Sequence, residues 1–373
     1  METPAFQRIV VKLGTSTLTG GGDRLVPALM VEIVRQLSIL HSKGCEIILV
    51  SSGAMAAGRE RLDFPDLPKT IPQKQMLSAV GQLRLMSIYE QLFEIFGFSV
   101  AQVLLTRRDI VRRRSYLNAR NTLLALLGSG VVPIVNENDT VATEEIRVGD
   151  NDNLSSQVAN LIDAQLLLLL TDQPGLFTAD PRRDGYAVFL PEVADPEILD
   201  YVWKAAGTGN GHLGTGGMTT KLQAADLARR SGTTTIIARG SDPDVVLRAI
   251  NGEQIGTRFP ALISALESRK RFPMSGWDGA SRVYIDAGAV NALAGGSSLL
   301  AVGITRVEGE FQRGDTIAVQ SEDGRQVARG LVRYQAGDVA RILGKRSTEI
   351  EPILGYEYGQ AVIHRDHLVL TTV

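Results

Sequence analysis

Residues 8–16 read RIVVKLGTS, a short apolar run that ends in a lysine and a glycine. We interpret 8–12 as a β-strand and the residues after it as a loop. Similar apolar runs recur up to about Ala265, and helix-length periodic stretches lie between them. This alternation predicts a three-layer α/β/α sandwich with a mostly parallel sheet covered by helices on both faces. Further strands are expected at 46–50, 99–105, 131–135, 165–170 and 234–238, and helices at 28–42, 74–96, 115–127, 154–163 and 218–231.

The sequence pattern changes near residue 268. A basic segment that also contains Pro273 and Gly276 indicates a linker, and short alternating segments with glycine turns follow it. We therefore expect an α/β domain over 1–267, a linker over 268–279 and a small β-rich domain over 280–373. Strands are expected in the small domain at 282–286, 316–320 and 326–331.

Composition is that of an ordinary globular protein. The 373 residues exceed what one hydrophobic core usually serves, and the formal net charge of −2 gives no general reason to bind nucleic acid or anionic membranes. The single cysteine, Cys45, lies just before an apolar run, so a buried thiol is expected. The start of the chain does not resemble a signal peptide, and no apolar segment has membrane-spanning length. These features predict a cytoplasmic protein without a membrane partner.

Polar residues follow several of the expected strands. They occur in 12–16 after the first strand, 51–54 after the second, 136–139 after the fourth and 171–175 after the fifth. Ligands of parallel sheets bind beyond the carboxyl ends of the strands. We therefore expect these loops to converge on one functional edge.

A glycine-rich stretch, 207–221, leads into a helical pattern and ends in Lys221. Glycines allow close backbone approach, and a helix N-terminus attracts phosphate, so the stretch suggests a nucleotide-phosphate cradle. A surface loop is the alternative. Lys12 and Lys221 would together offset the charge of a transferring phosphoryl group if both loops meet at the sheet edge.

An acidic and amide cluster lies in two neighbouring segments. Such a cluster can capture the ammonium group of an amino acid, hold a metal ion or orient the two lysines. One member, Asn153 or Asp152, is also expected to cap a helix that begins at Leu154. No protein metal site stands out, although magnesium can enter with a nucleotide. The cluster consists of Asn136, Asp139, Asp150, Asn151, Asp152 and Asn153.

Several motifs together resemble the glutamate 5-kinase family, within the amino acid kinase superfamily, with a C-terminal PUA domain. The resemblance covers nearly the whole chain. Its motifs are residues 10–16, 51–54, 57–59, 136–139, 149–154, 171–176, 214–221, 295–300 and 353–356.

The resemblance implies the amino acid kinase fold and ATP-dependent phosphorylation of the L-glutamate γ-carboxylate, the first step of proline biosynthesis, with inhibition by proline and Mg²⁺ between the phosphates. It implies that Lys12 and Lys221 stabilise the transferring phosphate and that Asp152 orients them. The residues implied for glutamate are Ser52, Gly53, Asn136, Asp139, Asp150 and Asn151. Those implied for ATP are Lys12, Thr171, Asp172, Thr215, Gly216, Gly217, Met218, Thr219, Thr220 and Lys221.

Partners follow from the same resemblance. We expect a homo-oligomer, either a dimer or a tetramer, and coupling to glutamyl phosphate reductase. A PUA domain suggests RNA, but from Trp277 onward 10 Lys and Arg face 12 Asp and Glu, a balance that disfavours RNA binding. The alternative is an RNA-binding protein with a degenerate catalytic domain, and the intact lysine pair favours the kinase.

Overall fold

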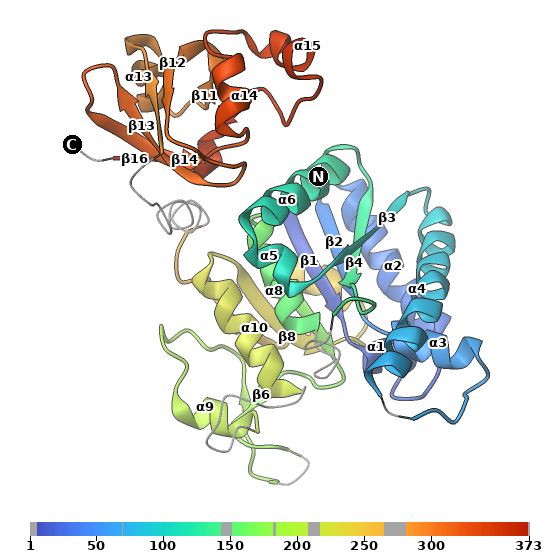
Figure 1. Cartoon of the computed structure of the whole chain (residues 1–373). Coiled ribbons are helices and arrows are strands. Elements are labelled where there is room, and N and C mark those ends of the chain that lie inside the picture. Colours follow the sequence, from blue (N-terminus) through green and yellow to red (C-terminus); the bar gives the residue numbers. More distant parts are fainter. Residues whose placement is uncertain are drawn as a thin grey trace. The chain divides into compact units, whose positions relative to one another are not determined.

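The structure is a computed structural model that describes residues 6–68, 70–142, 151–181, 184–207, 217–264 and 281–371. The chain divides into two compact units (Figure 1), and each has its own hydrophobic core. The larger unit consists of Met1–Val111 and Asn118–Ile263, and the smaller of Arg112–Leu117 and Ser264–Val373.

The larger unit is built on a seven-stranded sheet in the order β3-β4-β2-β1-β5-β8-β9. Six strands are parallel, and the short edge strand β9 runs antiparallel to β8. A mostly parallel sheet was expected, and it is confirmed. The strands are β1 (Arg8–Leu13), β2 (Glu46–Ser51), β3 (Val100–Leu105), β4 (Val132–Glu137), β5 (Leu166–Thr171), β8 (Thr234–Arg239) and β9 (Thr257–Phe259), and a separate hairpin pairs β6 (Leu176–Phe177) with β7 (Phe189–Leu190).

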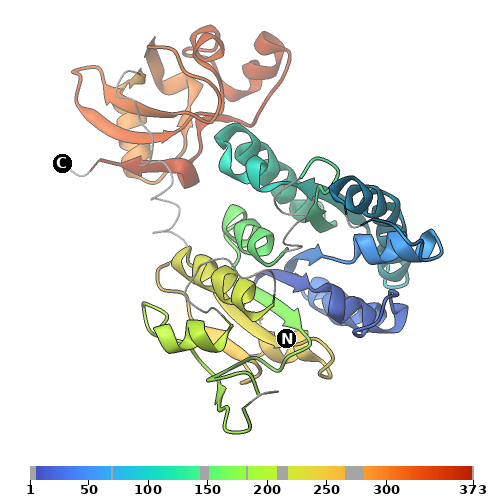
Figure 2. The ribbon, with the colours of Figure 1, turned by 60° about the horizontal axis from the view of Figure 1, so that its bottom comes forward.

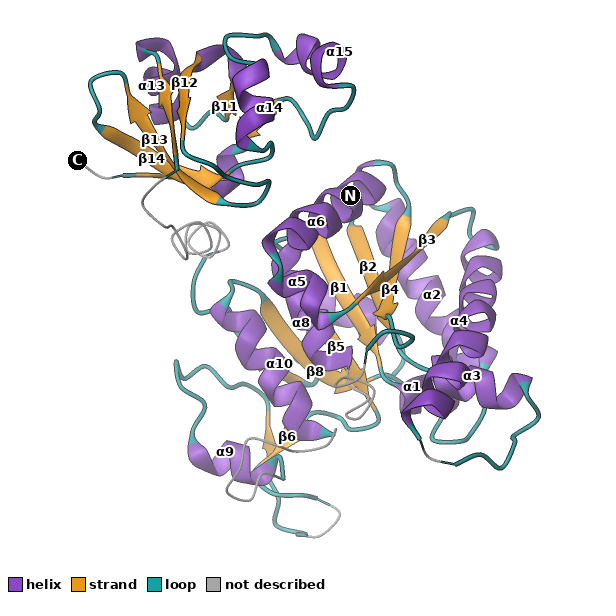
Figure 3. Ribbon diagram, viewed as in Figure 1, coloured by secondary structure: helices purple, strands orange, loops and turns teal. Residues whose placement is uncertain are grey.

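Helices cover both faces of this sheet. Helices α8 and α10 pack together on one face, and α2, α4 and α11 pack on the other (Figures 1 and 2). Figure 3 shows the strands between these two helical layers. The helices are α1 (Thr15–Thr19), α2 (Pro27–Ser42), α3 (Ala54–Arg61), α4 (Ile71–Glu94), α5 (Arg107–Val111), α6 (Arg113–Gly128), α8 (Asn151–Leu161), α9 (Asp200–Ala205), α10 (Met218–Arg230) and α11 (Val245–Ile250).

The alternation of side chains along β1 decides where its lysine lies. Ile9, Val11 and Leu13 belong to the core formed with α2 and α4. Because successive residues of a strand point to opposite faces, Lys12 points to the face that carries α8 and α10. The lysine is therefore enclosed between the sheet and these two helices, with only 4% of it exposed.

Most of the expected elements of this unit are found within a few residues of their predicted bounds. Short elements were missed, among them α1, α3, α9 and the β6–β7 hairpin. The predicted helix cap is wrong, because α8 begins at Asn151 rather than Leu154, so Asp152 and Asn153 lie inside its first turn. Cys45 is buried as expected, and burial raises the pKa of its thiol.

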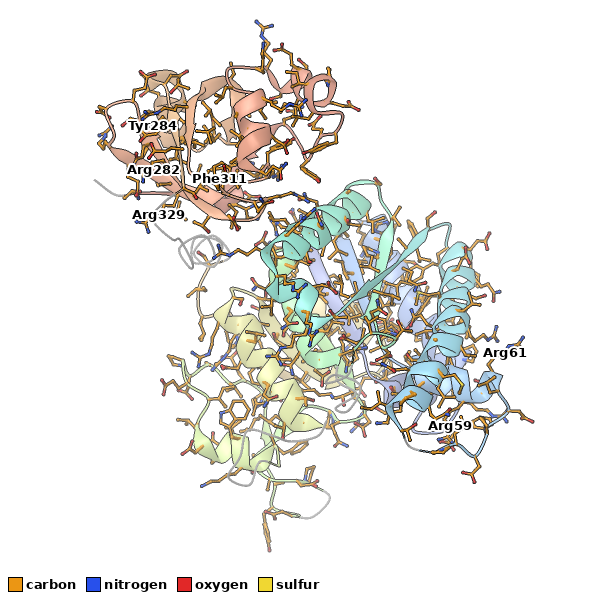
Figure 4. All side chains as sticks on the ribbon, in the orientation of Figure 1. Arg59, Arg61, Arg282, Tyr284, Phe311 and Arg329 are labelled. Atoms are coloured by element: carbon orange, nitrogen blue, oxygen red, sulfur yellow. The ribbon has the colours of Figure 1, made fainter. Side chains whose placement is uncertain are left out.

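The smaller unit contains a five-stranded sheet in the order β12-β10-β13-β14-β16 and a two-stranded sheet, β11-β15. On one sheet face Arg306 stacks over the Tyr284 ring at 3.7 Å, and Tyr284 donates a hydrogen bond to Glu308; Figure 4 shows Tyr284 near Arg282. The elements are β10 (Arg282–Ile285), α13 (Ala287–Ala294), β11 (Leu299–Leu300), η2 (Ala301–Gly303), β12 (Ile304–Glu308), β13 (Thr316–Ser321), β14 (Gln326–Leu331), α14 (Ala336–Arg341), η3 (Ser347–Glu349), α15 (Ile350–Leu354), β15 (Ala361–Ile363), η4 (Arg365–His367) and β16 (Leu368–Leu370).

Candidate active site

The carboxyl ends of the central parallel strands form the site. Strands β2, β1 and β5 lie side by side, and Lys12 pairs in register with Val50 on one side and Leu169 on the other. The loops that follow these strands therefore meet at one edge of the sheet, as the sequence predicts. Helices α8 and α10 bring two further segments to the same edge.

Two lysines that are far apart in the sequence contact one carboxylate. The Lys12 ammonium donates to Asp152 Oδ1, and the Lys221 ammonium donates to Asp152 Oδ2 at 3.1 Å. Thr220 also donates to Oδ2, at 2.8 Å. The structure thus brings together the three residues that the sequence suggests for phosphoryl transfer, and we call Lys12, Asp152 and Lys221 the charge triad.

Two members of the charge triad, Lys12 and Asp152, are buried, with only 1% of Asp152 exposed, and Lys221 is partly buried. Burial by itself would raise the pKa of the Asp152 carboxyl. The two ammonium groups and the hydrogen bonds from Lys12 and Thr220 outweigh this effect and hold the pKa below its ordinary value. Asp152 is consequently an anion at neutral pH, and it is suited to hold cations rather than to move a proton.

A small cavity of 110 Å³ opens beside the charge triad. Asn151 lies at its wall and donates hydrogen bonds to the Ser51 carbonyl at 2.6 Å, to Asn136 Oδ1 at 2.8 Å and to Ser52 Oγ at 3.3 Å. Gly53, with φ of 92°, adopts the left-handed conformation that lets α3 begin directly after the loop. The cavity is lined by Thr15, Ser52, Gly53, Ala54, Met55, Ala56, Asn136, Glu137, Asp139 and Asn151.

A larger cavity of 760 Å³ lies on the side of α10 and falls in the range of about 300–1,000 Å³ found for drug-sized ligands. Lys221 Nζ lies 3.5 Å from the carbonyl oxygen of Gly217, which lines this cavity. Asn151, the residue before Asp152, lines the small cavity, and Gly217, which Lys221 contacts, lines the large one. The larger one is lined by Gln173, Gly175, Leu176, Phe177, Thr178, Ala179, Asp180, Pro181, Tyr201, Lys204, Ala205, Ala206, Gly207, Gly217 and Met218.

Other expected nucleotide residues have different surroundings. Thr171 and Asp172 are hydrogen-bonded to each other at the end of β5 and line neither of these two cavities. The Thr219 hydroxyl donates to the Ala206 carbonyl at the end of α9. Three residues expected in the site, Asp150, Thr215 and Gly216, lie outside the described residues.

Helix α9 is the part of the larger cavity that sequence reasoning missed. It presents Tyr201 and Lys204, three residues apart and thus on one helical face, to the cavity. Its six residues are too few for a recognisable period, although the aromatic and basic pair is a signal that could have been weighed.

Comparison with known proteins places this geometry in a family. The pattern of the amino acid kinase family matches residues 7–239, a range that includes the whole charge triad. The chain belongs to the amino acid kinase family. The pattern of the PUA domain matches residues 281–354. As a kinase, this family member uses ATP as a substrate, and the expected α/β fold with a C-terminal PUA domain is confirmed.

Full-length relatives of this amino acid kinase carry the name glutamate 5-kinase. The relative from Shewanella amazonensis is 55% identical over 366 residues, which cover 98% of this chain and 96% of the relative. One from Photobacterium profundum is 55% identical over 98% of this chain and 97% of its own. One from Herpetosiphon aurantiacus is 53% identical over 99% of this chain and 100% of its own. The expected resemblance is confirmed.

Two features are absent from the described residues. In the described part of the chain, no helix is both long and apolar enough to span a membrane. Within the same residues, no group of three or more His, Cys, Asp and Glu side chains is arranged to hold a metal ion.

Proposed function

We propose that this chain is a glutamate 5-kinase, which transfers the γ-phosphoryl group of ATP to the γ-carboxylate of L-glutamate and forms γ-glutamyl phosphate and ADP. The observation that carries the proposal is the charge triad, with Asn151 beside Asp152 in the wall of a small cavity and Gly217 beside Lys221 in the wall of a large one. The names of the full-length relatives support glutamate as the substrate. This reaction would be the first step of proline biosynthesis.

The amino acid would occupy the small cavity. Ser52, Asp139 and Asn151 offer hydroxyl, carboxylate and amide groups to its ammonium and α-carboxylate, with Gly53 and Asn136 beside them. Asp150 lies outside the described residues and is also proposed to bind the amino acid. ATP would occupy the large cavity, with the stretch from Thr215 to Lys221 around its phosphates and with Thr171 and Asp172 nearby.

The transfer needs no general base, because the glutamate γ-carboxylate is already ionised at neutral pH. One carboxylate oxygen forms a bond to the γ-phosphorus while the bond to the bridging oxygen of ADP breaks, and its electron pair stays on ADP. Lys12 and Lys221 would offset the negative charge that meets between the two anionic reactants. Asp152, held ionised, would keep both ammonium groups at this point. Mg²⁺ would neutralise further phosphate charge when bound.

A trapping assay tests the substrate. Purified protein incubated with ATP, Mg²⁺ and hydroxylamine should give a hydroxamate with L-glutamate. L-aspartate and N-acetyl-L-glutamate are the matched controls, since the first shortens the side chain and the second removes the ammonium charge. A hydroxamate from either control and none from L-glutamate would reject the proposed substrate.

The remaining proposals follow from the same family. We propose that proline inhibits the enzyme, that the chain forms a dimer or a tetramer, that it is coupled to glutamyl phosphate reductase and that it is cytoplasmic. The boundaries 1–267, 268–279 and 280–373 also stay proposals for the kinase domain, the linker and the PUA domain. Limited proteolysis followed by mass spectrometry would test the linker, and light scattering would test the oligomer.

A further inference from the structure

Helix α4 carries a polar stripe, which we define as Gln75, Ser78, Gln82 and Tyr89, and two of its side chains hydrogen-bond to residues that line the small cavity. Their spacing of three, four and seven residues places them on one face of the helix. Ser78 and Gln82 contact residues that line the cavity, whereas the partners of Gln75 and Tyr89 do not line it. The Ser78 hydroxyl donates a hydrogen bond to Asp139 Oδ2, and Gln82 Oε1 accepts one from Asn136 at 2.7 Å. Gln75 donates to the Ala142 carbonyl at 3.1 Å. Tyr89 and Ser51 share a hydrogen bond of 2.8 Å.

Two amides in the cavity wall have defined orientations, and Gln82 accepts the hydrogen bond of one of them. The Glu137 backbone N–H can only donate, so the Asn136 atom that faces it at 2.9 Å is Oδ1. Asn136 Nδ2 then faces Gln82, whose Oε1 accepts its hydrogen bond. Asn136 Oδ1 also accepts from Asn151 Nδ2, which leaves Asn151 Oδ1 directed away from these partners. Asn151 Oδ1 is thus an acceptor of the kind that a substrate ammonium requires.

Ser78 fixes the carboxylate of the same wall. Its hydroxyl is buried and donates to Asp139 Oδ2, so it selects one rotamer of a side chain that lines the cavity. A hydrogen bond to a charged acceptor is about twice as strong as one between neutral groups. Ser78 itself does not line the cavity.

The position of α4 is set by unusually close packing against α3. A Cβ atom on Gly81 would lie 1.7 Å from the Ala54 carbonyl oxygen, and one on Gly58 would lie 1.9 Å from the Leu77 carbonyl oxygen. Both obstacles are backbone atoms, which cannot rotate away. Since α3 begins directly after Gly53, this crossing ties α4 to the loop that forms the cavity floor.

We propose that Ser78 and Gln82 are positioning residues for the amino-acid substrate, which act through Asp139 and Asn136 without contact to the reacting atoms. The inference rests on the proposed function. Loss of either side chain would loosen substrate binding and leave the charge triad and the nucleotide cavity unchanged. The KM for glutamate should therefore rise, while kcat and the KM for ATP stay near the wild-type values.

The test compares each variant with a control nine residues further along α4, on the opposite side of the helix. Ser78→Ala is paired with Ser87→Ala, and Gln82→Leu with Gln91→Leu. The full-length protein is assayed by hydroxamate formation, with glutamate and ATP varied in turn, and thermal unfolding of each variant is recorded. We expect the KM for glutamate to rise about ten- to a hundredfold in Ser78→Ala and about two- to tenfold in Gln82→Leu.

Three outcomes separate the hypotheses. A glutamate KM that is unchanged in both stripe variants, or that rises equally in the controls, would overturn the positioning role. A fall in kcat or a rise in the KM for ATP of equal size would also overturn it, because a general structural defect has that signature. Wild-type protein that forms no hydroxamate from glutamate would instead overturn the proposed function. If Ser78→Ala does not fold, Gln82→Leu decides the question.

Discussion

Replacing Lys221 by methionine separates the catalytic part of the charge triad from its structural part. The Lys221 ammonium lies 3.1 Å from Asp152 Oδ2, which corresponds to a gross attraction of about 5 kcal/mol at an effective dielectric constant of about 20. Most of this is offset by desolvation. Asp152 keeps Lys12 and Thr220 as partners in the variant. We therefore expect the free energy of unfolding to fall by only about 1–3 kcal/mol.

The effect of Lys221→Met on catalysis should be larger than its effect on folding. Loss of one preorganised electrostatic donor raises a barrier by about 3–4 kcal/mol, a factor of about 10²–10³ in kcat. The assay is the hydroxamate rate at saturating glutamate and ATP, with urea unfolding of the same sample. Lys43→Met, on an exposed lysine, is the control. Near-normal kcat in a folded Lys221→Met protein would refute the role of this cation.

Three further changes test other parts of the structure. Gly81→Ala places a Cβ against a backbone oxygen of α3 and should lower the free energy of unfolding by about 3 kcal/mol. Gly128→Ala, with no atom within 4 Å of the new Cβ, should leave the free energy of unfolding unchanged. Equal urea midpoints for the two variants would contradict the close crossing of α3 and α4. Because the folded-state pKa of Asp152 is lowered, its charge stabilises the protein above its ordinary pKa of 3.8, and this stabilisation is lost progressively as the pH falls from 3.8 toward the lower folded-state pKa. The difference in melting temperature between wild type and Asp152→Asn should therefore shrink in acid, and a constant difference would be evidence against the pKa shift. Tyr89→Phe removes the buried hydrogen bond to Ser51 and should cost about 1 kcal/mol in thermal unfolding, and an unchanged stability would argue against that bond.

The strands of the larger unit could be predicted because they are buried on both faces. Residues 166–170 are all leucine and all fully or almost fully buried, so no alternation interrupts the apolar run. The loops at the carboxyl ends followed from the parallel arrangement. Contact of both Lys12 and Lys221 with Asp152 could be expected from the sequence. The sequence did not reveal that α8 begins at Asn151, so that Asp152 lies in the first turn of the helix and points inward.

Two parts of the site could not be predicted, for different reasons. Helix α9 is too short to show a period. The polar stripe of α4 lies in a long helix whose opposite side is also polar, with exposed residues such as Arg84 and Glu90. Only packing against α3 and β3 decides which polar face turns inward. By contrast Arg59 and Arg61, in the last turn of α3, extend outward as charged side chains usually do (Figure 4).

The sequence separation of the charge triad has a consequence for protein synthesis. Lys12 and Asp152 are 140 residues apart, and Asp152 and Lys221 a further 69. At about 5–20 residues per second, a ribosome needs roughly ten seconds or more to add the last cation after the first. Under the proposed mechanism, a nascent chain cannot transfer phosphate until α10 has left the exit tunnel and docked, so products that end before Lys221 should be catalytically silent.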